Sequence, residues 1–396
     1  MARFLLIPHA PGGTLAHLAA CISVAEALRE RGHETVFAYG GTRPELLDEA
    51  GFERRPVLEA GGAMSLEWFE TDEDLERILA SQLEAIEGTD PDACITSAGA
   101  GRLAVRVAGT PHLALAHGLG NTPPGRRGRR RYALLDDLRR PSRGIEDLRH
   151  QLRPRSSSVS VEVWERAWTR HAGGPLGGET AMTGHADAVA WSSTPLLDPA
   201  RGMPAHWHYV GPLSFAPASH ETKPPVETGR PRAYVSQGST GTPELLRRSV
   251  AEVAGAGFDV VVSTGGLCEP EELEPLGDRV EARELHDTRA ELAAADIAVI
   301  GGGHMTATEA LMAGVPTLVV PRTISQALAA KRAERLGTGI GLWPRVPEGS
   351  LARAALRLSS RDGYRRRAQG VAEHLRGWDG PGNAADLAEF VSRLRG

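Results

Sequence analysis

Residues 300–321 have the sequence IGGGHMTATEALMAGVPTLVVP, in which an apolar run leads through three glycines into a helical pattern and then into a second apolar run. Both apolar runs are short and end in Gly or Pro, as the buried strands of a parallel sheet do. A strand, a helix and a strand with short connections form a βαβ unit, which requires a parallel sheet. This stretch therefore predicts an α/β domain.

Similar apolar runs recur on both sides of this stretch, with helical patterns between them. In residues 17–31 the apolar side chains recur at helical spacing. Residues 214–232 are rich in Pro, Ser and Thr and lack apolar periodicity, which is typical of a linker. We therefore predict two Rossmann-like, doubly wound domains, 1–213 and 233–382, on either side of this linker. The expected strands lie within residues 3–10, 34–40, 92–99, 111–118, 186–194, 207–213, 233–240, 259–266, 296–303 and 316–321.

The composition is that of a protein with a sizeable core: 396 residues, 41% hydrophobic and 24% charged, with a net charge of −5. That length suits two domains of about 150–200 residues each. The hydrophobic fraction excludes a disordered chain, and the negative net charge excludes a general nucleic-acid binder. There is no apolar run of about 18 residues and no secretory signal pattern, and the three cysteines are scattered. We therefore expect a cytoplasmic protein without a disulfide framework or a zinc site.

One segment departs from this balance. Residues 126–155 contain eleven Arg and four acidic residues, a net charge of +7. Such a segment is often a solvated excursion of a domain without chemical function. Clustered Arg also attracts an anionic acceptor or an anionic membrane surface. The sequence leaves these three interpretations open.

Glycines join a predicted strand to a helix in three loops, at residues 12–13, 238–241 and 301–303. The amino end of a helix has unpaired N–H groups and a partial positive charge, and a preceding glycine lets a phosphate approach closely. Neither the first nor the last loop has GxGxxG followed by an acidic residue about 20 positions on, which disfavours a dinucleotide. Glu309 lies one to two turns into the last helix, where its carboxylate can accept hydrogen bonds from ribose hydroxyls. Together these features indicate a nucleotide site in the second domain.

Two longer stretches carry a resemblance to a known family: GGTLAHLAACISVAEALRERGHETVFA, residues 12–38, and GGGHMTATEALMAGVPTLVVPRTISQALAAKRAERLGTGI, residues 301–340. They resemble the two halves of a GT-B glycosyltransferase, as in the family 1 enzymes that decorate natural products and in the MurG-type N-acetylglucosaminyltransferase. YVGPL, residues 209–213, precedes the linker as in that family.

The resemblance implies two Rossmann-like domains that face a cleft. The first would hold the acceptor and the second a nucleoside-diphosphate sugar, and the last helix, about 383–396, would pack back onto the first domain. The resemblance also implies inversion at the anomeric carbon and no requirement for a metal.

Single residues acquire roles by the same resemblance. His17 matches the general base, Glu309 the ribose-binding glutamate, and Gln326 the second member of an Asp-Gln pair that touches sugar hydroxyls. The backbone of Leu285 and His286 falls where the family recognises the base. From the loops and the resemblance together, the predicted donor-binding residues are Gly13, Gly238, Ser239, Thr240, Leu285, His286, Gly302, Gly303, His304, Met305, Thr306, Glu309, Ser325 and Gln326.

Four positions depart from the family pattern. Met305 stands where family 1 enzymes have the later glycine of the loop motif. Gly301 stands where family 1 enzymes usually have His, which brings this loop closer to MurG-type enzymes. Ser325 replaces the Asp of the Asp-Gln pair, which allows a deoxy or otherwise modified sugar. Ser97 stands where many family 1 enzymes have the Asp that orients the catalytic His. Without that carboxylate, His17 would be a weaker base unless another acid reaches it.

The chemistry of the reaction agrees with these assignments. Histidine, with a pKa near ~6.5, can take the proton of an acceptor hydroxyl at pH 7. Backbone N–H groups of residues 302–306 would stabilise the departing diphosphate. A His at the start of a helix also caps or packs, which is the alternative for His17.

The acceptor side carries weaker signals. We predict contacts from Trp164 and Trp168, an i, i+4 pair on a helical pattern, and from His117. Core packing is the alternative for the tryptophans, and a structural role is the alternative for His117. His206 and His208 lie two apart without a recognisable third ligand, so we expect no zinc site.

We therefore expect a metal-independent, inverting glycosyltransferase that moves a sugar from a UDP- or dTDP-sugar to a hydroxyl or similar nucleophile of a small natural product, in antibiotic or secondary-metabolite biosynthesis. The alternatives are a MurG-like transferase with a lipid-linked acceptor and a GT-B homologue that binds sugar but no longer transfers it. The expected partners are the donor and the acceptor, with no nucleic acid and no cofactor. Membrane contact is not expected, and a homodimer stays open.

Overall fold

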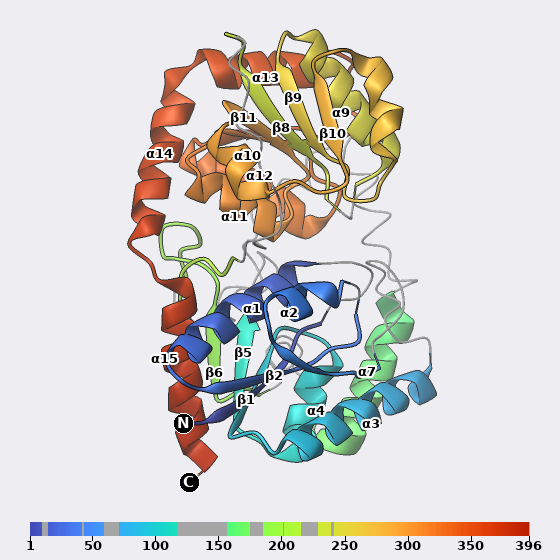
Figure 1. Cartoon of the computed structure of the whole chain (residues 1–396), viewed down its shortest axis with the longest axis vertical. Helices are drawn as coiled ribbons and strands as arrows, with labels where there is room; N and C mark the ends of the chain where they lie inside the picture. The colour runs from blue at the N-terminus through green and yellow to red at the C-terminus, as the bar shows by residue number, and fades with distance from the viewer. Residues whose placement is uncertain are drawn as a thin grey trace.

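A computed structural model gives the structure of the protein and describes residues 1–9, 15–41, 43–58, 71–116, 157–174, 185–200, 202–214, 229–238 and 241–395. These residues form two parallel sheets with helices on both faces, which lie at opposite ends of the long axis of the molecule (Figure 1). The prediction of two doubly wound α/β units is confirmed. No helix within the described ranges is long and apolar enough to cross a membrane.

Within the described ranges, the first sheet has seven strands in the order β3-β2-β1-β4-β5-β6-β7, all parallel. Because β1 pairs with β2 on one side and β4 on the other, the winding reverses there, and ligands of such sheets bind beyond the carboxyl ends at this point. The strands are β1 (Arg3–Ile7), β2 (Glu34–Ala38), β3 (Glu53–Arg55), β4 (Ala93–Thr96), β5 (His112–Ala116), β6 (Ala188–Trp191) and β7 (Trp207–Tyr209).

Alternate residues of the first sheet pack on its opposite faces, as the pleat of a strand requires. Phe4 and Leu6 of β1 belong to the core under α1, whereas Leu5 and Ile7 belong to the core under α3, α4 and α7. We call this sheet and its helices the first domain. Its helices are α1 (Leu15–Glu30), α2 (Glu45–Glu49), α3 (Asp72–Thr89), α4 (Ala100–Ala108) and α7 (Ser157–Ala172).

The second sheet, in the described part of the chain, has six parallel strands in the order β10-β9-β8-β11-β12-β13. Its winding reverses between β8 and β11, and with its helices it makes the second domain. β8 begins at Arg232, the last residue of the predicted linker, and residues 215–228 of that linker lie outside the described residues. The strands are β8 (Arg232–Ser236), β9 (Asp259–Ser263), β10 (Val280–Arg283), β11 (Ile297–Ile300), β12 (Thr317–Val319) and β13 (Gly339–Gly341).

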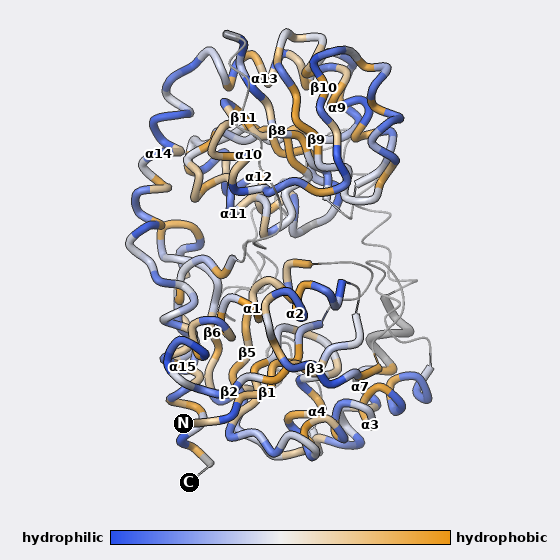
Figure 2. Tube along the Cα trace, in the orientation of Figure 1, coloured by the Kyte–Doolittle hydropathy of each residue, from blue (hydrophilic) through white to orange (hydrophobic). Residues whose placement is uncertain are grey.

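Helices cover both faces of the second sheet. α9 and α13 share a core with one face, and α11 and α12 share a core with the other. Figure 2 shows inner strands such as β1, β5 and β9 as hydrophobic, while α14 on the outside is largely hydrophilic. The helices are α9 (Pro243–Gly255), η3 (Pro270–Leu276), α10 (Thr288–Ala293), α11 (His304–Met312), α12 (Ile324–Leu336), α13 (Ser350–Ser360) and α14 (Asp362–Arg376).

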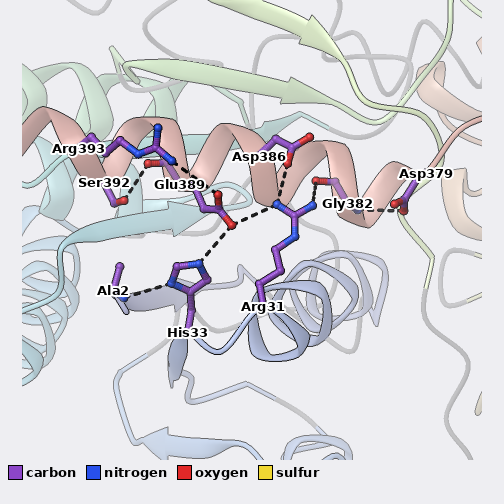
Figure 3. A network of polar contacts seen from close by, with 9 residues as sticks. All are labelled: Ala2, Arg31, His33, Asp379, Gly382, Asp386, Glu389, Ser392 and Arg393. Atoms are coloured by element: carbon purple, nitrogen blue, oxygen red, sulfur yellow. Dashed lines mark hydrogen bonds and ion pairs between the residues drawn. The ribbon is translucent and has the colours of Figure 1, made fainter.

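The chain returns to the first domain at its end. After α14, helix α15 (Gly380–Ser392) and the short η4 (Arg393–Arg395) lie along the first domain, and α15 packs on α1 (Figure 1). Arg31 at the end of α1 pairs with Asp386 at 2.7 Å and donates to the carbonyl oxygen of Gly382 at 2.9 Å, and His33 lies 3.2 Å from Glu389 (Figure 3). Polar contacts therefore reinforce an apolar interface between segments at opposite ends of the sequence.

Candidate active site

Three loops lie side by side at the carboxyl ends of the central strands of the second sheet. Gly301 follows β11, and a Cβ atom added to it would lie 2.7 Å from the carbonyl oxygen of Gln237, which follows β8. A Cβ atom on Gly265, in the loop after β9, would lie 3.8 Å from the carbonyl carbon of Gly238. The backbone of the neighbouring loop leaves room only for glycine at position 301.

The glycine loop leads directly into α11. Gly302 has φ +92°, which L side chains rarely adopt, and a Cβ atom there would lie 2.7 Å from a methyl group of β12. Gly303 is the N-cap of α11 and faces open space. The first N–H groups of a helix, those of His304, Met305 and Thr306 in α11, have no acceptor within the helix. The amino end of α11 can therefore hold an anion.

Glu309 lies in the second turn of α11 and is buried, with 4% of its surface exposed. Its Oε1 lies 3.9 Å from Nε of Arg289, and its Oε2 has no hydrogen-bond partner among the described residues. Burial raises the pKa of the Glu309 carboxyl to about 7; the charge of Arg289 opposes this rise and that of Asp287 adds to it. A buried oxygen without a partner has lost its hydrogen bonds to water, so a ligand hydroxyl at Oε2 would be favourable.

The segment between β10 and α10 adjoins the loop after β9, which donates a backbone hydrogen bond of 2.9 Å to it. In this segment His286 is buried, and its Nδ1 lies 3.4 Å from Oε1 of Glu291. Arg232 donates to the other oxygen of Glu291 at 2.7 Å. This buried group holds the side chain of His286 and thereby fixes the backbone of Leu285 and His286 at the edge of the sheet.

At the corresponding edge of the first sheet, His17 is the third residue of α1 and is half-buried. Its ring faces that of His9, with the ring centroids 6.0 Å apart and the planes at 77°. His9 is buried, and its backbone N–H donates to Oγ of Ser97 at 2.9 Å. Burial, and then the charge of Arg102, lowers the pKa of His9 to about 3. His17 therefore packs against an imidazole that is neutral at physiological pH.

The two domains contact each other beside these elements. Nη2 of Arg289 on α10 donates at 2.8 Å to Oγ of Ser214, the first residue of the predicted linker. Arg332 on α12 is buried and pairs with Asp198 of the first domain at 3.3 Å. Both helices that flank α11 therefore touch the first domain or the chain that leaves it.

Solved structures share the fold of this chain, although no family model matches it. The glycotransferase of kitacinnamycin matches 98% of this chain and 99% of its own, with a TM-score of 0.75 and 20% identity. CalG4, the calicheamicin glycosyltransferase, matches 99% and 98%, with a TM-score of 0.71 and 21% identity. VinC, a glycosyltransferase solved in complex with dTDP, matches 99% of each chain, with a TM-score of 0.65 and 19% identity. These likenesses show the GT-B fold.

Sequence relatives supply the class of activity. The PGL/p-HBAD biosynthesis rhamnosyltransferase of Mycobacterium bovis is 25% identical over 376 residues, which are 91% of this chain and 82% of the relative. The demethyllactenocin mycarosyltransferase of Streptomyces fradiae is 30% identical over 185 residues, 46% of this chain and 40% of the relative. The chain is a GT-B glycosyltransferase. The resemblance, the fold class and the class of enzyme predicted from the sequence are thereby confirmed.

Many of the predicted donor residues lie at one edge of the second sheet of the glycosyltransferase. Their contact with a donor stays a prediction, as do the catalytic role of His17 and the domain boundaries at 213 and 233. Several predictions fall outside the described residues: Gly13, Ser239, Thr240, His117 and the Arg-rich segment 126–155. Within the described ranges, no three His, Cys, Asp or Glu side chains gather as a metal site would require.

Gln326 has a structural task that the resemblance did not include. It is the third residue of α12, and its Oε1 accepts the backbone N–H groups of Arg322 at 2.8 Å and Thr323 at 3.0 Å. Thr323 Oγ1 accepts the N–H of Gln326 in return, which completes a capping box. A contact between this oxygen and a sugar hydroxyl would require the cap to open. Ser325 beside it is exposed, so its hydroxyl is the more accessible group.

The structure corrects the predicted acceptor role of Trp168. Both tryptophans lie on α7, with ring centroids 6.0 Å apart. Trp168 is 1% exposed and packs with Leu75 and Val105 in the core of the first domain. Its ring has almost no surface left for an acceptor, so the core alternative holds. Trp164 is half-buried and packs against this core.

Three residues that the sequence did not single out contribute to the site of the glycosyltransferase: His9 beside His17, Gln237 beside Gly301, and Arg289 beside Glu309. His9 and Gln237 each lie just beyond the end of a strand, β1 and β8, and near the carboxyl end of a predicted strand range, at the edge where ligands bind such sheets. That position was a usable signal. The contact of Arg289 with Glu309 depends on how α10 packs on α11, and the local sequence gives no sign of it.

Proposed function

We propose that this glycosyltransferase moves a sugar from a UDP- or dTDP-sugar to a hydroxyl or similar nucleophile of a small natural product, in antibiotic or secondary-metabolite biosynthesis. Transfer inverts the anomeric carbon and requires no metal. The observation that carries the proposal is the buried Glu309, whose Oε2 has no hydrogen-bond partner among the described residues and which follows a glycine loop on α11. Ribose hydroxyls would supply the missing hydrogen bonds, and the diphosphate would lie at the amino end of the helix.

A dTDP-linked deoxysugar is the donor that we favour. Ser325 replaces a carboxylate that would bind the hydroxyls of a glucose-type sugar, so the site is less suited to a fully hydroxylated donor. The relatives are named for rhamnosyl and mycarosyl transfer, and both sugars lack the 6-hydroxyl group. The similar glycosyltransferase VinC was solved with dTDP.

In the proposed reaction His17 takes the proton of the acceptor hydroxyl. The acceptor oxygen forms a bond to the anomeric carbon on one face while the bond from that carbon to the diphosphate oxygen breaks on the other, which inverts the centre. A base of this kind typically contributes about 10²–10⁴ in rate. The neighbouring imidazole of His9 is neutral, so it places no full charge beside the imidazolium that forms on His17.

The departing diphosphate gains negative charge as the bond breaks. The N–H groups of the first turn of α11 are fixed in place by the helix, so they can stabilise that charge without reorganisation. This arrangement supports transfer without a metal ion.

Calorimetric titration with dTDP and UDP at pH 8 tests the proposal. Glu309→Gln keeps the shape of the side chain and removes its charge, so we expect at least about tenfold weaker binding of whichever nucleotide the wild type binds. Glu373→Gln, at an exposed position of α14, is the matched control and should bind as the wild type does. Wild-type protein that binds neither nucleotide, or equal binding by Glu309→Gln, would contradict the proposal.

A further inference from the structure

Arg289, the second residue of α10, contacts three parts of the molecule. Its Nε lies 3.9 Å from Oε1 of Glu309, and its Nη2 donates to Oγ of Ser214 at 2.8 Å. The same Ser214 hydroxyl lies 3.9 Å from the sulfur of Met312, the last residue of α11. The guanidinium therefore lies between the carboxylate of α11 and the chain that leaves the first domain.

The charge of Arg289 also acts on the first domain. Burial raises the pKa of Glu26 on α1, and Arg289 is one of the two cations that oppose this rise, with Arg29 as the stronger. One guanidinium thus acts on a carboxyl group of each domain. Its side chain is 43% exposed, so solvent weakens these interactions without removing them.

The other ionisable groups around Glu309 do not replace Arg289. Asp287, the N-cap of α10, is an anion, and Tyr234 of β8 is a phenol whose pKa burial raises. On the two other helices that pack against α11, the buried Arg332 of α12 pairs with Asp198, and Arg365 of α14 bonds to Asp296. Among the described residues, Arg289 is the one cation that acts on Glu309.

We propose that Arg289 is a positioning residue for Glu309: its guanidinium favours the carboxylate form facing a ribose and, through Ser214, ties Glu309 to the chain that connects the domains. This inference rests on the proposed function, because it concerns the nucleotide site of Glu309. Oε1 then faces the guanidinium of Arg289 at 3.9 Å, and Oε2 remains for the ligand. The donor site is thereby linked to the position of the first domain.

The proposal predicts a particular pH dependence of nucleotide binding. The ionised carboxylate is the stronger acceptor of hydroxyl hydrogen bonds. The Kd of the wild type should therefore fall as the pH rises through about 7, where Glu309 loses its proton. Without the guanidinium, the carboxylate would form only at higher pH.

Calorimetric titration with dTDP and UDP at pH 6, 7 and 9 tests this dependence. We expect Arg289→Gln to raise the Kd about fivefold at pH 7 and less than twofold at pH 9, where the carboxyl is ionised in both proteins. Arg289→Lys keeps the charge and should recover most of the affinity at pH 7. Ser214→Ala removes only the anchor and should raise the Kd about twofold at pH 7.

Arg247→Gln is the matched control, because Arg247 is similarly exposed and pairs with Glu272 away from the glycine loop. It should reproduce the wild-type profile. If the Kd of Arg289→Gln exceeds that of the wild type by the same ratio at every pH, the role of Arg289 is purely structural. That result would overturn this inference alone. Absence of binding of both nucleotides to the wild type would overturn the proposed function and this inference with it.

Discussion

His9 in the first domain and Glu309 in the second are buried titratable side chains at the ligand edges of their sheets. Burial disfavours the charged form of both side chains. Because the charged histidine is protonated and the charged glutamate is deprotonated, the two pKa values shift in opposite directions. Burial lowers the pKa of His9 to about 3 and raises that of Glu309 to about 7. His9 therefore stays neutral over the physiological range, whereas Glu309 changes its charge within it.

The difference matters for the roles that we propose for the two edges. His9 stays neutral over the physiological pH range, so it gives His17 a neighbour of constant charge. A binding carboxylate needs its charge when the ligand arrives, and the charge of Glu309 depends on Arg289 and on pH. We therefore expect the first domain to govern the chemical step and the second to govern donor affinity.

Substitution of His17 tests the first half of this comparison and has the largest expected effect. His17→Ala should lower kcat by about 10²–10⁴ because the general base is lost. The Kd for dTDP should stay within twofold of the wild-type value. His208→Ala, at an exposed position of β7, is the control and should keep wild-type turnover. Unchanged kcat in His17→Ala would remove the residue from the mechanism.

Stability against pH tests the second half. The unfolded chain releases the proton of Glu309 near pH 4.5, and the folded protein releases it only near pH 7. The free energy of unfolding therefore falls as the pH rises between these values and is level above them. Glu309→Gln removes this loss, so urea unfolding should show that the variant gains about 3 kcal/mol over the wild type between pH 4.5 and pH 8. The same difference at both pH values would mean that the carboxyl is not shifted.

The opposite sign is expected for His9. Its unfolded form takes up a proton below about pH 6.5, and the folded form does so only near pH 3. Stability from this group is therefore complete above pH 6.5 and is lost as the pH falls toward 3. His9→Asn should be less sensitive to acid than the wild type in the same urea experiment.

The smallest effect should come from the glycine loop, where positions 301 and 303 differ in the space available to a Cβ atom. Gly301→Ala would bring Cβ to 2.7 Å from a carbonyl oxygen, so we expect a loss of about 1–3 kcal/mol in the free energy of unfolding. Gly303→Ala has open space and φ −55°, so it should be nearly neutral. Equal stability of the two variants would show that the Gln237 backbone can move aside.

Much of the fold could be predicted because its strands are short apolar runs closed by Gly or Pro. The predicted helix over 17–31 corresponds to α1, Leu15–Glu30, and the helix expected after 301–303 begins at His304. β13 was missed because Gly339–Gly341 has no strand propensity and forms through pairing with β12. α3 was missed although Thr71 caps it.

The site could be predicted only in part. Glu309 was accessible because the loop and the helix around it are local in sequence. The capping box of Thr323 and Gln326 was also readable, since Thr followed three residues later by Gln is its signature. Arg289 and Ser214 are 75 residues apart, so their contact depends on the packing of two domains. Trp168 was misassigned because its helix pairs with α3 and α4 in the core.

The return of α15 to the first domain has a consequence for how the protein is made. Ala384, Ala388 and Val391 complete the same core as Leu18 and Ile22, so the ribosome must finish the chain before that apolar face can be covered. The second domain is contiguous in sequence, so it can fold before the first domain is complete. A nascent chain halted before α15 would expose an aggregation-prone apolar surface. A separately supplied α15 peptide would cover that surface.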